Sequence, residues 1–214
     1  MKASIVPVTA YQQNCSLWMC EKTKKIAVFD PGGDIEQIEA TAKKMGGELS
    51  VIFLTHGHMD HCAASDILRQ KYNVEIIGPH KDDDFWISKL PEWCEMSGFP
   101  HADAFEPDRW LEEGETVYFG EEALQVFHCP GHTPGHVIFF HKEAKLAAVG
   151  DVLFQGSIGR TDFPRGNHQD LIDSIQQKLW PLGDDITFIP GHGPTSTFGQ
   201  ERKTNPFVAD TRFG

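Results

Sequence analysis

The sequence has little of what membrane or exported proteins need. None of its apolar runs approaches the ~20 residues of a membrane-spanning helix, and hydrophobic residues make up an ordinary 40 % of the chain. The N-terminal segment has no signal-peptide core, because Pro7, Gln12 and Gln13 interrupt it. We therefore expect a cytoplasmic protein that does not associate with a membrane.

Cysteine is also scarce. The five cysteines include no C-x-x-C pair, and Cys15 and Cys20 are too far apart for a zinc knuckle. An odd number of scattered thiols is typical of a reducing compartment. This pattern argues against a disulfide scaffold and agrees with a cytoplasmic location.

Basic residues are few, since 19 of them stand against 31 acidic ones and the formal net charge is −12. No stripe of Lys or Arg is present to bind a phosphate backbone, so we expect no nucleic acid partner. Repeats, low-complexity tracts and linkers are absent as well. The sequence therefore predicts a single domain over residues 1–214 that acts on a small molecule, as a monomer or weak homo-oligomer.

Short apolar runs rich in β-branched and aromatic residues recur along the chain, and their length is that of strands. The predicted strands are residues 5–8, 16–20, 26–29, 51–54, 74–77, 116–119, 124–127, 137–140, 146–149 and 186–189.

Three segments have helical signals instead. Asp34 is a candidate N-cap for a helix that ends at Gly46. Residues 60–72 place Ala64, Leu68 and Tyr72 at helical spacing. Asn167 opens a third helix that ends before Pro181 and buries Leu171, Ile172, Ile175 and Leu179. Many strands with a few helices between them predict an α/β (α+β) sheet protein with helices on the outside.

The region from residue 81 to residue 109 has aromatic residues among prolines and glycines. Trp86, Trp93 and Phe99 are candidates either for the mouth of a site or for a local core. We expect this region to be irregular, with some helix.

The predicted strand at 51–54 is followed by four candidate metal ligands, His56, His58, Asp60 and His61, in the pattern H-x-H-x-D-H. Imidazole nitrogens and carboxylate oxygens are ligands for zinc, iron and manganese. One histidine after a strand is usually only hydrogen-bonded, and one aspartate at a helix start is usually an N-cap. The joint spacing of the four residues favours metal binding. The motif has a His/His pair followed by an Asp/His pair, and if these ligands cannot all reach one ion, two adjacent metal sites are indicated.

Three later strands also run into candidate ligands, namely His132, Asp151 and His192. Functional residues gather where strands hand over to loops at one edge of a sheet. Glycine or proline flanks each candidate, which allows sharp turns and a close approach of a metal. Seven ligands over two ions would leave coordination positions for solvent, as a catalytic site needs.

The remaining histidines are predicted not to bind these metals. His136 is expected to fix its loop by hydrogen bonding, and Cys129 to be a small packed residue. The others lie at strand ends or on polar surface: His80, His101, His128, His141 and His168.

Taken together, the motifs H-x-H-x-D-H, GHTPGH, GD and GHG resemble those of the metallo-β-lactamase superfamily, over residues 4–207. The resemblance implies an αββα sandwich of two mixed β-sheets with helices on both outer faces and metals at one edge between the sheets. It also implies a first metal on His56, His58 and His132, a second on Asp60, His61 and His192, and Asp151 as the bridge. Asp30 matches an aspartate that supports the ligand loop.

Within the superfamily, the chain looks like the glyoxalase II group, the hydroxyacylglutathione hydrolases, in its compact bacterial form. Asp151 stands where the best-known antibiotic-hydrolysing members have cysteine, and His58 stands where flavo-diiron members have glutamate. An NPF motif at residues 205–207 also matches. We expect no helical C-terminal domain of the kind that binds glutathione in longer members, and Gly193 replaces their tyrosine after the last metal histidine. Arg160 matches a basic residue that contacts glutathione.

The implied chemistry is thioester hydrolysis at two divalent metal ions, with zinc expected and iron or manganese as alternatives. Two ions about 3.5 to 4 Å apart lower the pKa of a shared water from ~15.7 towards ~7. The bridging hydroxide would attack S-lactoylglutathione and release lactate and glutathione, a step of methylglyoxal detoxification. Asp60 would orient the hydroxide and accept its proton, and a thiolate with a pKa near ~8.5 would leave without a strong general acid.

Two other functions stay open. His56, His132 and Asp151 alone could form a 2-His-1-carboxylate iron site, as in persulfide dioxygenases, which share the GRTDF sequence around Arg160 and would act on glutathione persulfide. The other is a non-catalytic, metal-binding member of the family.

Overall fold

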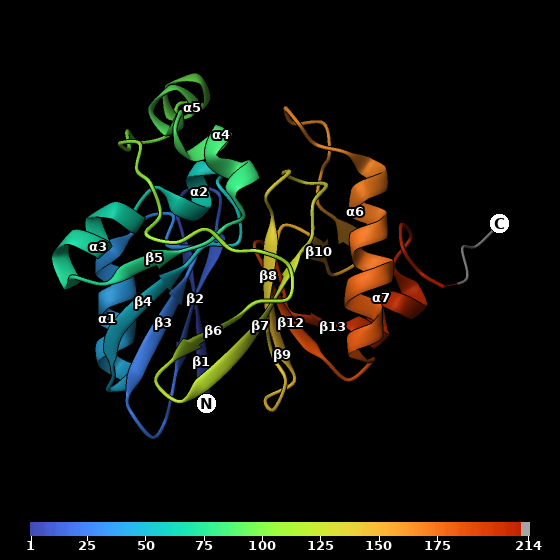
Figure 1. Ribbon diagram of the computed structural model, residues 1–214, viewed down its shortest axis with the longest axis horizontal. Coiled ribbons are helices and arrows are strands. Elements are labelled where there is room, and N and C mark those ends of the chain that lie inside the picture. The colour runs from blue at the N-terminus through green and yellow to red at the C-terminus, as the bar shows by residue number, and fades with distance from the viewer. Residues whose placement is uncertain (211–214) are drawn as a thin grey trace.

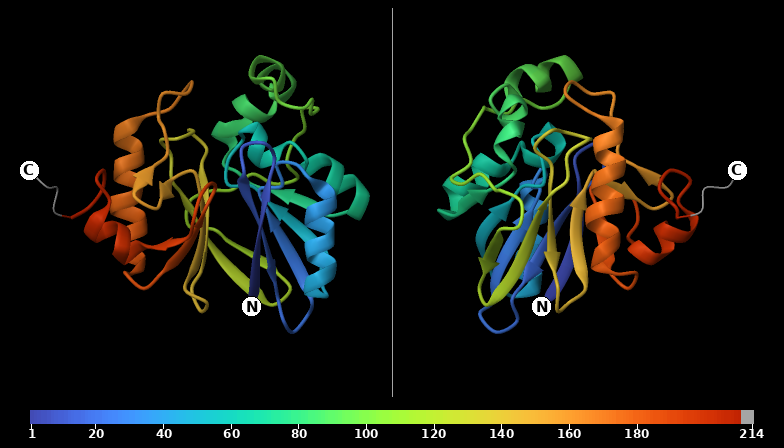
Figure 2. Two further views of the ribbon diagram at one scale, coloured as in Figure 1. Left: turned by 180° about the vertical axis from the view of Figure 1, so that it is seen from behind. Right: turned by 45° about the vertical axis from the view of Figure 1, so that its right-hand side comes forward.

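Two β-sheets face each other in the computed structural model, which describes residues 1–210 (Figure 1). Helices cover the outer face of each sheet, as views from behind and from the side also show (Figure 2). The architecture is the predicted αββα sandwich, an α/β (α+β) fold. The last four residues of the predicted domain, 211–214, lie outside the described part of the chain.

The first sheet has the strand order β1-β2-β3-β4-β5. Its strands are β1 (Lys2–Val8), β2 (Gln13–Met19), β3 (Lys25–Phe29), β4 (Glu48–Phe53) and β5 (Glu75–Ile77). The sheet is mixed, because β1, β2 and β3 pair antiparallel whereas β3, β4 and β5 pair parallel.

The second sheet has the order β13-β12-β9-β8-β7-β6. Its strands are β6 (Thr116–Phe119), β7 (Glu122–His128), β8 (Val137–His141), β9 (Leu146–Gly150), β12 (Thr187–Pro190) and β13 (Ser196–Thr197). Only β9 and β12 pair parallel among these neighbours. A small hairpin of β10 (Leu153–Phe154) and β11 (Ser157–Ile158) follows β9.

Residues 1–210 contain seven α-helices. They are α1 (Ile35–Met45), α2 (Met59–Cys62), α3 (Ser65–Tyr72), α4 (Asp84–Ile87), α5 (Leu90–Ser97), α6 (His168–Ser174) and α7 (Phe198–Thr204). Helices α1 and α3 lie on the first sheet, whereas α6 and α7 lie on the second (Figures 1 and 2). No helix within residues 1–210 is both long and apolar enough to cross a membrane.

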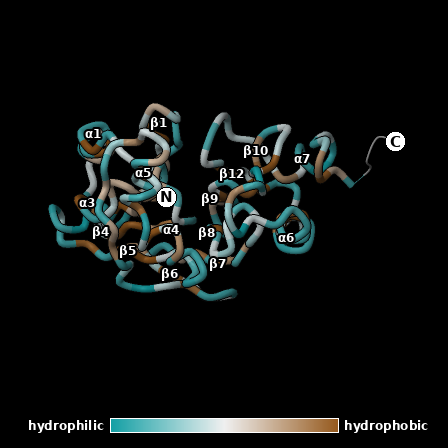
Figure 3. The backbone as a smooth tube through the Cα atoms, turned by 90° about the horizontal axis from the view of Figure 1, so that it is seen from above, coloured by the Kyte–Doolittle hydropathy of each residue, from teal (hydrophilic) through white to brown (hydrophobic). Residues whose placement is uncertain are grey.

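Three apolar layers hold the four structural layers together. The central one lies between the sheets and contains an aromatic group in which Phe29, Phe53 and Phe139 have ring centroids 5.0 to 5.5 Å apart. The two outer ones join each sheet to its helices. Viewed from above, apolar residues gather along strands such as β5, β8 and β9 (Figure 3). Because aromatic residues bury large apolar areas, the central layer stabilises the packing of the two sheets on each other.

All ten predicted runs lie in or overlap strands of the two sheets. β1 shows why the pattern works, since its buried and exposed residues alternate with period two, as on a half-buried edge strand. Proline has no backbone N–H to donate to a neighbouring strand. Pro7 is tolerated in β1 because β1 is an edge strand, with a neighbour on one side only. The two-residue strands β10, β11 and β13 were not predicted, because they are too short to show periodicity.

The predicted helix over residues 60–72 was wrong in its continuity. It is broken into α2 and α3, because the backbone N–H of Ala64 donates to the carbonyl of Pro31 rather than to its own helix. Leu68 is fully buried, but Tyr72 is 37 % exposed. The ligand candidates Asp60 and His61 therefore lie in α2, separate from α3.

Asp34 is the N-cap residue of α1, as predicted, but its side chain makes no capping hydrogen bond. Asp34 precedes α1 in a left-handed conformation, and its carboxylate accepts the backbone N–H of Thr9 instead of one from the helix. Asn167, by contrast, caps α6 as predicted, since its side chain accepts from the N–H groups of Gln169 and Asp170.

The third helix continues further than predicted but in altered form. After α6 the chain forms a π-helical turn over Ile175–Leu179 and a 3₁₀ turn over Trp180–Leu182 that contains Pro181. All four predicted core residues of this helix are buried, namely Leu171, Ile172, Ile175 and Leu179.

Candidate metal centre

The seven predicted ligands come together at one edge of the two sheets. β4 leads into the loop of residues 54–58, which we call the first ligand loop, and then into α2. Residues 129–136 between β7 and β8 form the second ligand loop. β9 and β12 are parallel neighbours, so Asp151 and His192, which follow them, reach the same edge.

Three histidine nitrogens converge in the first cluster, which consists of His56, His58 and His132. The Nδ1 atom of His58 lies 3.1 Å from Nε2 of His56 and 3.0 Å from Nε2 of His132. Burial lowers the pKa of all three imidazoles, and neighbouring histidines lower those of His56 and His58 further. Neutral rings expose nitrogen lone pairs, so this cluster could hold a metal ion.

The second cluster consists of Asp60, His61 and His192 and could also hold a metal ion. Nε2 of His192 lies 3.2 Å from Oδ2 of Asp60, and Nε2 of His61 lies 3.8 Å from the same oxygen. Burial alone would lower the pKa of both histidines. The carboxylates of Asp60 and Asp151 outweigh burial and raise both pKa values, so this cluster prefers a positive charge at its centre.

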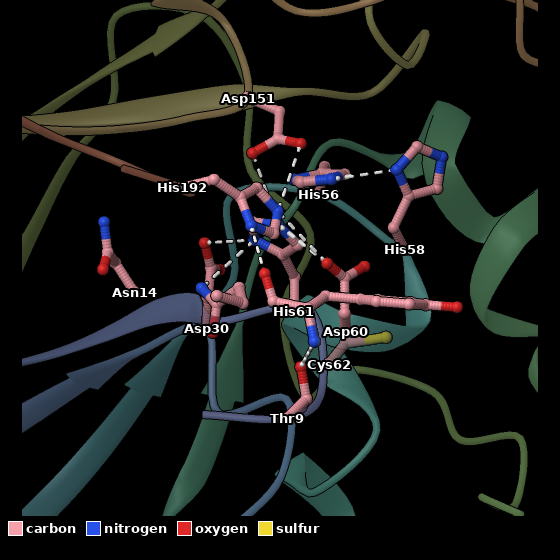
Figure 4. Close-up of polar contacts among 12 residues, drawn as sticks. Thr9, Asn14, Asp30, His56, His58, Asp60, His61, Cys62, Asp151 and His192 are labelled. Atoms are coloured by element: carbon pink, nitrogen blue, oxygen red, sulfur yellow. Dashed lines mark hydrogen bonds and ion pairs between the residues drawn. The ribbon is translucent and has the colours of Figure 1, made fainter. Parts of the chain in front are cut away.

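Asp151 lies between the two clusters (Figure 4). Its Oδ2 is 3.5 Å from Nε2 of His132 in the first cluster and 3.8 Å from Nε2 of His192 in the second. Burial opposes its charge, but His61 and the other histidines outweigh burial and hold the pKa of Asp151 well below its usual range. An ionised carboxylate in this place can contact cations in both clusters.

The ring nitrogens that face away from the clusters also fit a metal-binding role for these histidines. His132 and His192 each point Nδ1 at a backbone carbonyl, of Arg160 at 2.8 Å and of Tyr11 at 3.1 Å. Nδ1 of His61 lies 3.0 Å from the carboxylate of Asp30. Metal-binding histidines characteristically donate their second N–H to such acceptors, which fixes the ring and directs the other nitrogen at the metal.

Asp30 supports both clusters. Its carboxylate accepts the backbone N–H and the hydroxyl of Thr55, at 2.7 and 2.6 Å, in addition to its contact with His61. The Thr55 oxygen in turn lies 3.0 Å from Nδ1 of His56. One buried carboxylate therefore orients a histidine of each cluster, as the resemblance implied for the ligand loop.

Two inward-facing atoms fit a cation directly. Nε2 of His61 and Oδ1 of Asp151 are buried and have no hydrogen-bond partner within the described residues. Leaving such atoms unsatisfied is costly in a folded protein, and a bound cation satisfies both. The donor set of imidazoles and carboxylates suits divalent zinc, iron or manganese.

His136 has the supporting role predicted for it. Its Nε2 accepts the backbone N–H of Asp151 at 3.0 Å, and its ring stacks on His56 with centroids 4.6 Å apart.

Asn14, which carried no signal in the sequence, donates to the carbonyls of Pro190 and Gly193 and so holds the loop of His192. Amide side chains are common in all kinds of position, and only the fold brings this one to the site.

The remaining histidines lie away from the two clusters. His141 pairs with Glu122, His101 pairs with Asp103, and His168 begins α6. His80 and His128 stack beside Asp82 on the outer side of the second ligand loop. These three residues could hold a metal ion by proximity, although the rings are nearly parallel, at 16°, and Nε2 of His128 lies 2.8 Å from the carbonyl of Pro134.

A cavity of about 740 Å³ opens directly over the clusters. Trp86 and Trp93 line it, so these two residues lie at a site mouth, one of the two alternatives left open. Phe99 follows the other alternative, because it packs against the apolar layer between the first sheet and its helices.

Phe163 also lines the cavity, with its ring centroid 6.1 Å from that of Trp86, and the guanidinium of Arg160 lies 4.2 Å over the Phe163 ring. Arg160 is the only Lys or Arg in this lining among residues 1–210, and Asp162 pairs with it.

A four-layer αββα sandwich with histidine and aspartate clusters at one sheet edge defines a class of metal-binding proteins. The chain belongs to the metallo-beta-lactamase superfamily, whose family model matches residues 8–192. It is 49 % identical over 209 residues to the hydroxyacylglutathione hydrolase GloC of Haemophilus influenzae, covering 97 % of this chain and 98 % of that protein.

Solved structures agree with this placement. The B3 metallo-beta-lactamase BLEG-1 has a TM-score of 0.89 and 34 % identity, with 97 % of this chain and 99 % of that one covered. TTHA1623, solved in a di-iron-bound form, has a TM-score of 0.87 and 33 % identity, with 96 % and 100 % covered.

Proposed function

We propose that the protein is a binuclear metal-dependent thioester hydrolase that converts S-lactoylglutathione to lactate and glutathione. The observation that carries this proposal is Asp151, whose ionised carboxylate lies between two clusters that could each hold a metal ion. The similarity to the hydrolase GloC along nearly the whole chain supports the substrate class. The di-iron form of the related TTHA1623 supports two metals, with zinc expected here and iron or manganese as alternatives.

The protein residues have distinct roles in this proposal. The first cluster would hold one ion, the second would hold the other, and Asp151 would contact both. Bound ions of this kind supply Lewis acidity and lower the pKa of water towards ~7, which makes a nucleophile available at neutral pH. Asp60, whose Oδ2 faces the second cluster, would orient that nucleophile and accept its proton. The thiol of glutathione has a pKa near ~8.5, so it leaves without a strong general acid.

The cavity suits a glutathione thioester in charge and shape. Glutathione carries carboxylates, and Arg160 is the cation available to one of them in the cavity lining of the described residues. Its ion pair with Asp162 and its place over Phe163 hold the guanidinium near the cavity. The indoles of Trp86 and Trp93 provide apolar wall for the acyl group and the methylene groups of the substrate.

The test is a comparison of three substrates on one preparation of measured metal content. Hydrolysis of S-lactoylglutathione, with little turnover of a β-lactam or of glutathione persulfide, is the expected result. Oxygen-dependent consumption of glutathione persulfide by protein that holds a single iron would instead favour the dioxygenase. Turnover of the β-lactam alone would favour the reaction of the B3 relative, and no turnover with both metals bound would indicate a non-catalytic member.

A further inference from the structure

Asp83 lies outside both clusters yet binds both loops that supply the first cluster. Its side chain is fully buried. Oδ2 accepts the backbone N–H of Gly57, between His56 and His58, at 2.8 Å, and the hydroxyl of Thr133, next to His132, also at 2.8 Å. Oδ1 accepts the backbone N–H of Gly135 at 2.6 Å. One carboxylate thus joins a loop of the first sheet to a loop of the second.

The segment that carries Asp83 lies directly against these loops. A Cβ atom on Gly135 would come within 2.5 Å of the Asp83 backbone nitrogen, and one on Gly57 would come within 2.8 Å of Cβ of Trp86. Real Cβ atoms do not approach so closely, so both positions require glycine. This packing therefore explains one glycine in each ligand loop, Gly57 and Gly135.

The same segment forms part of the cavity wall. Trp86 lies three residues after Asp83, and its ring meets the ring of His58 edge-on, with centroids 4.4 Å apart at 87°. Trp86 also lines the cavity. The position of this wall and the position of the first cluster are thus set by one short stretch of chain.

We propose that Asp83 is a positioning residue that holds His56, His58 and His132 at metal-binding distance by tying the two ligand loops together. The proposal rests on the proposed metal centre. A buried carboxylate that accepts three hydrogen bonds is a strong and directional link, because hydrogen bonds to charged groups are about twice as strong as neutral ones. Burial raises the pKa of Asp83 to about 6, so the group is mostly ionised at neutral pH.

The test measures cobalt(II) binding to purified protein by visible absorption, in two backgrounds. His192→Ala impairs the second cluster and reports on the first, whereas His58→Ala reports on the second. Asp83→Asn keeps the shape of the side chain but replaces one acceptor oxygen by a donor. The matched control is Asp84→Asn, because Asp84 is the adjacent residue, pairs with Lys81 and belongs to none of the candidate metal clusters among the described residues.

We expect Asp83→Asn to weaken cobalt binding at the first cluster by about 10- to 100-fold, as loss of an outer partner does at other metal sites. Binding at the second cluster, and binding by the Asp84→Asn control, should stay as in the parent proteins. Unchanged affinity at the first cluster overturns the proposal. Equal weakening of both clusters also overturns it, because that is the effect of a general loss of structure.

Thr133→Val is a second variant in case Asp83→Asn does not fold. It removes one hydrogen bond to Asp83 and keeps the volume of the side chain. The proposal requires weaker cobalt binding at the first cluster here too, and unchanged binding contradicts it. The measurement needs no substrate, so failure of the parent protein to hydrolyse S-lactoylglutathione would disprove the proposed function without deciding the role of Asp83.

Discussion

Oδ1 of Asp151 and Nε2 of His61 face each other at 3.3 Å, and neither makes a hydrogen bond within the described residues. The two atoms come from different sheets, since His61 follows β4 and Asp151 follows β9. Buried polar atoms are almost always satisfied in folded proteins. Imidazole nitrogen and carboxylate oxygen are both metal-ligand atoms, so the point where they meet fits a bound cation.

Asp60→Ala and Asp151→Ala should each abolish thioester hydrolysis. Loss of even an outer partner of a metal ligand costs about 10- to 100-fold, so loss of a ligand should cost more than ~100-fold. Steady-state hydrolysis of S-lactoylglutathione is the measurement, and Asp103→Ala, an exposed carboxylate beside His101, is the control. Near wild-type turnover of either variant would rule out the assigned roles.

The two clusters should lose their metals at different pH values. In the metal-free protein the pKa values of His61 and His192 are raised, so protons compete with a metal at the second cluster at higher pH than they do at the first. The histidines of the first cluster have lowered pKa values and stay neutral to lower pH. As the pH falls from about 8 to 5, metal should therefore leave the second cluster first.

Metal content after dialysis at a series of pH values checks this order. The expected curve of metal content against pH has two steps. The step at higher pH is loss of metal from the second cluster, and the step at lower pH is loss of metal from the first. A single step, or retention of metal by the second cluster after the first has emptied, contradicts the assignment of charge to the two clusters.

Arg160→Ala should raise the KM for S-lactoylglutathione with little change in kcat. A hydrogen bond from a charged group contributes about 1.5 kcal/mol, which corresponds to roughly a tenfold change in affinity. Arg165→Ala is the matched control, because its guanidinium lies over Phe85 and outside the cavity lining. Equal effects of the two variants would show that Arg160 does not contact the substrate.

Asn205→Ala should lower the free energy of unfolding by about 2 kcal/mol, because several buried hydrogen bonds are lost and their partners are left unpaired. Asn205 is fully buried, donates to the carbonyl of Ser157 in the β10–β11 hairpin and to Glu201, and accepts the N–H of Phe207. Urea unfolding measures the effect. The exposed neighbour variant Thr204→Ala should change stability by less than about 0.5 kcal/mol, and equal stability of the two variants would contradict this role.

Much of the fold could be predicted because its strands are short, apolar and separated by clear breaks. The positions of His132, Asp151 and His192 could be predicted because each lies in the loop that follows a strand, and strand ends collect at one edge. The break at Ala64 could not be predicted, since it depends on a hydrogen bond to Pro31, more than thirty residues earlier in the chain.

Other parts of the site could not be predicted from the sequence for the same reason. Asp83 lies in a run of three aspartates, and no local signal distinguishes it, the buried one, from Asp82 and Asp84, which are not buried. Asn14 acts through contacts with Pro190 and Gly193, at the opposite end of the chain. Asn14 and Asp83 bind mainly backbone groups of loops that are distant in the sequence, so they can be identified only from the tertiary structure.

The most direct test of the two-cluster account is a titration of metal-free protein with zinc, in which the initial rate of S-lactoylglutathione hydrolysis is followed. The account predicts that the rate rises to a plateau only when both clusters are filled, and that Asp151→Ala stays inactive throughout. A plateau at one bound ion per chain, with no gain from a second, would contradict the account.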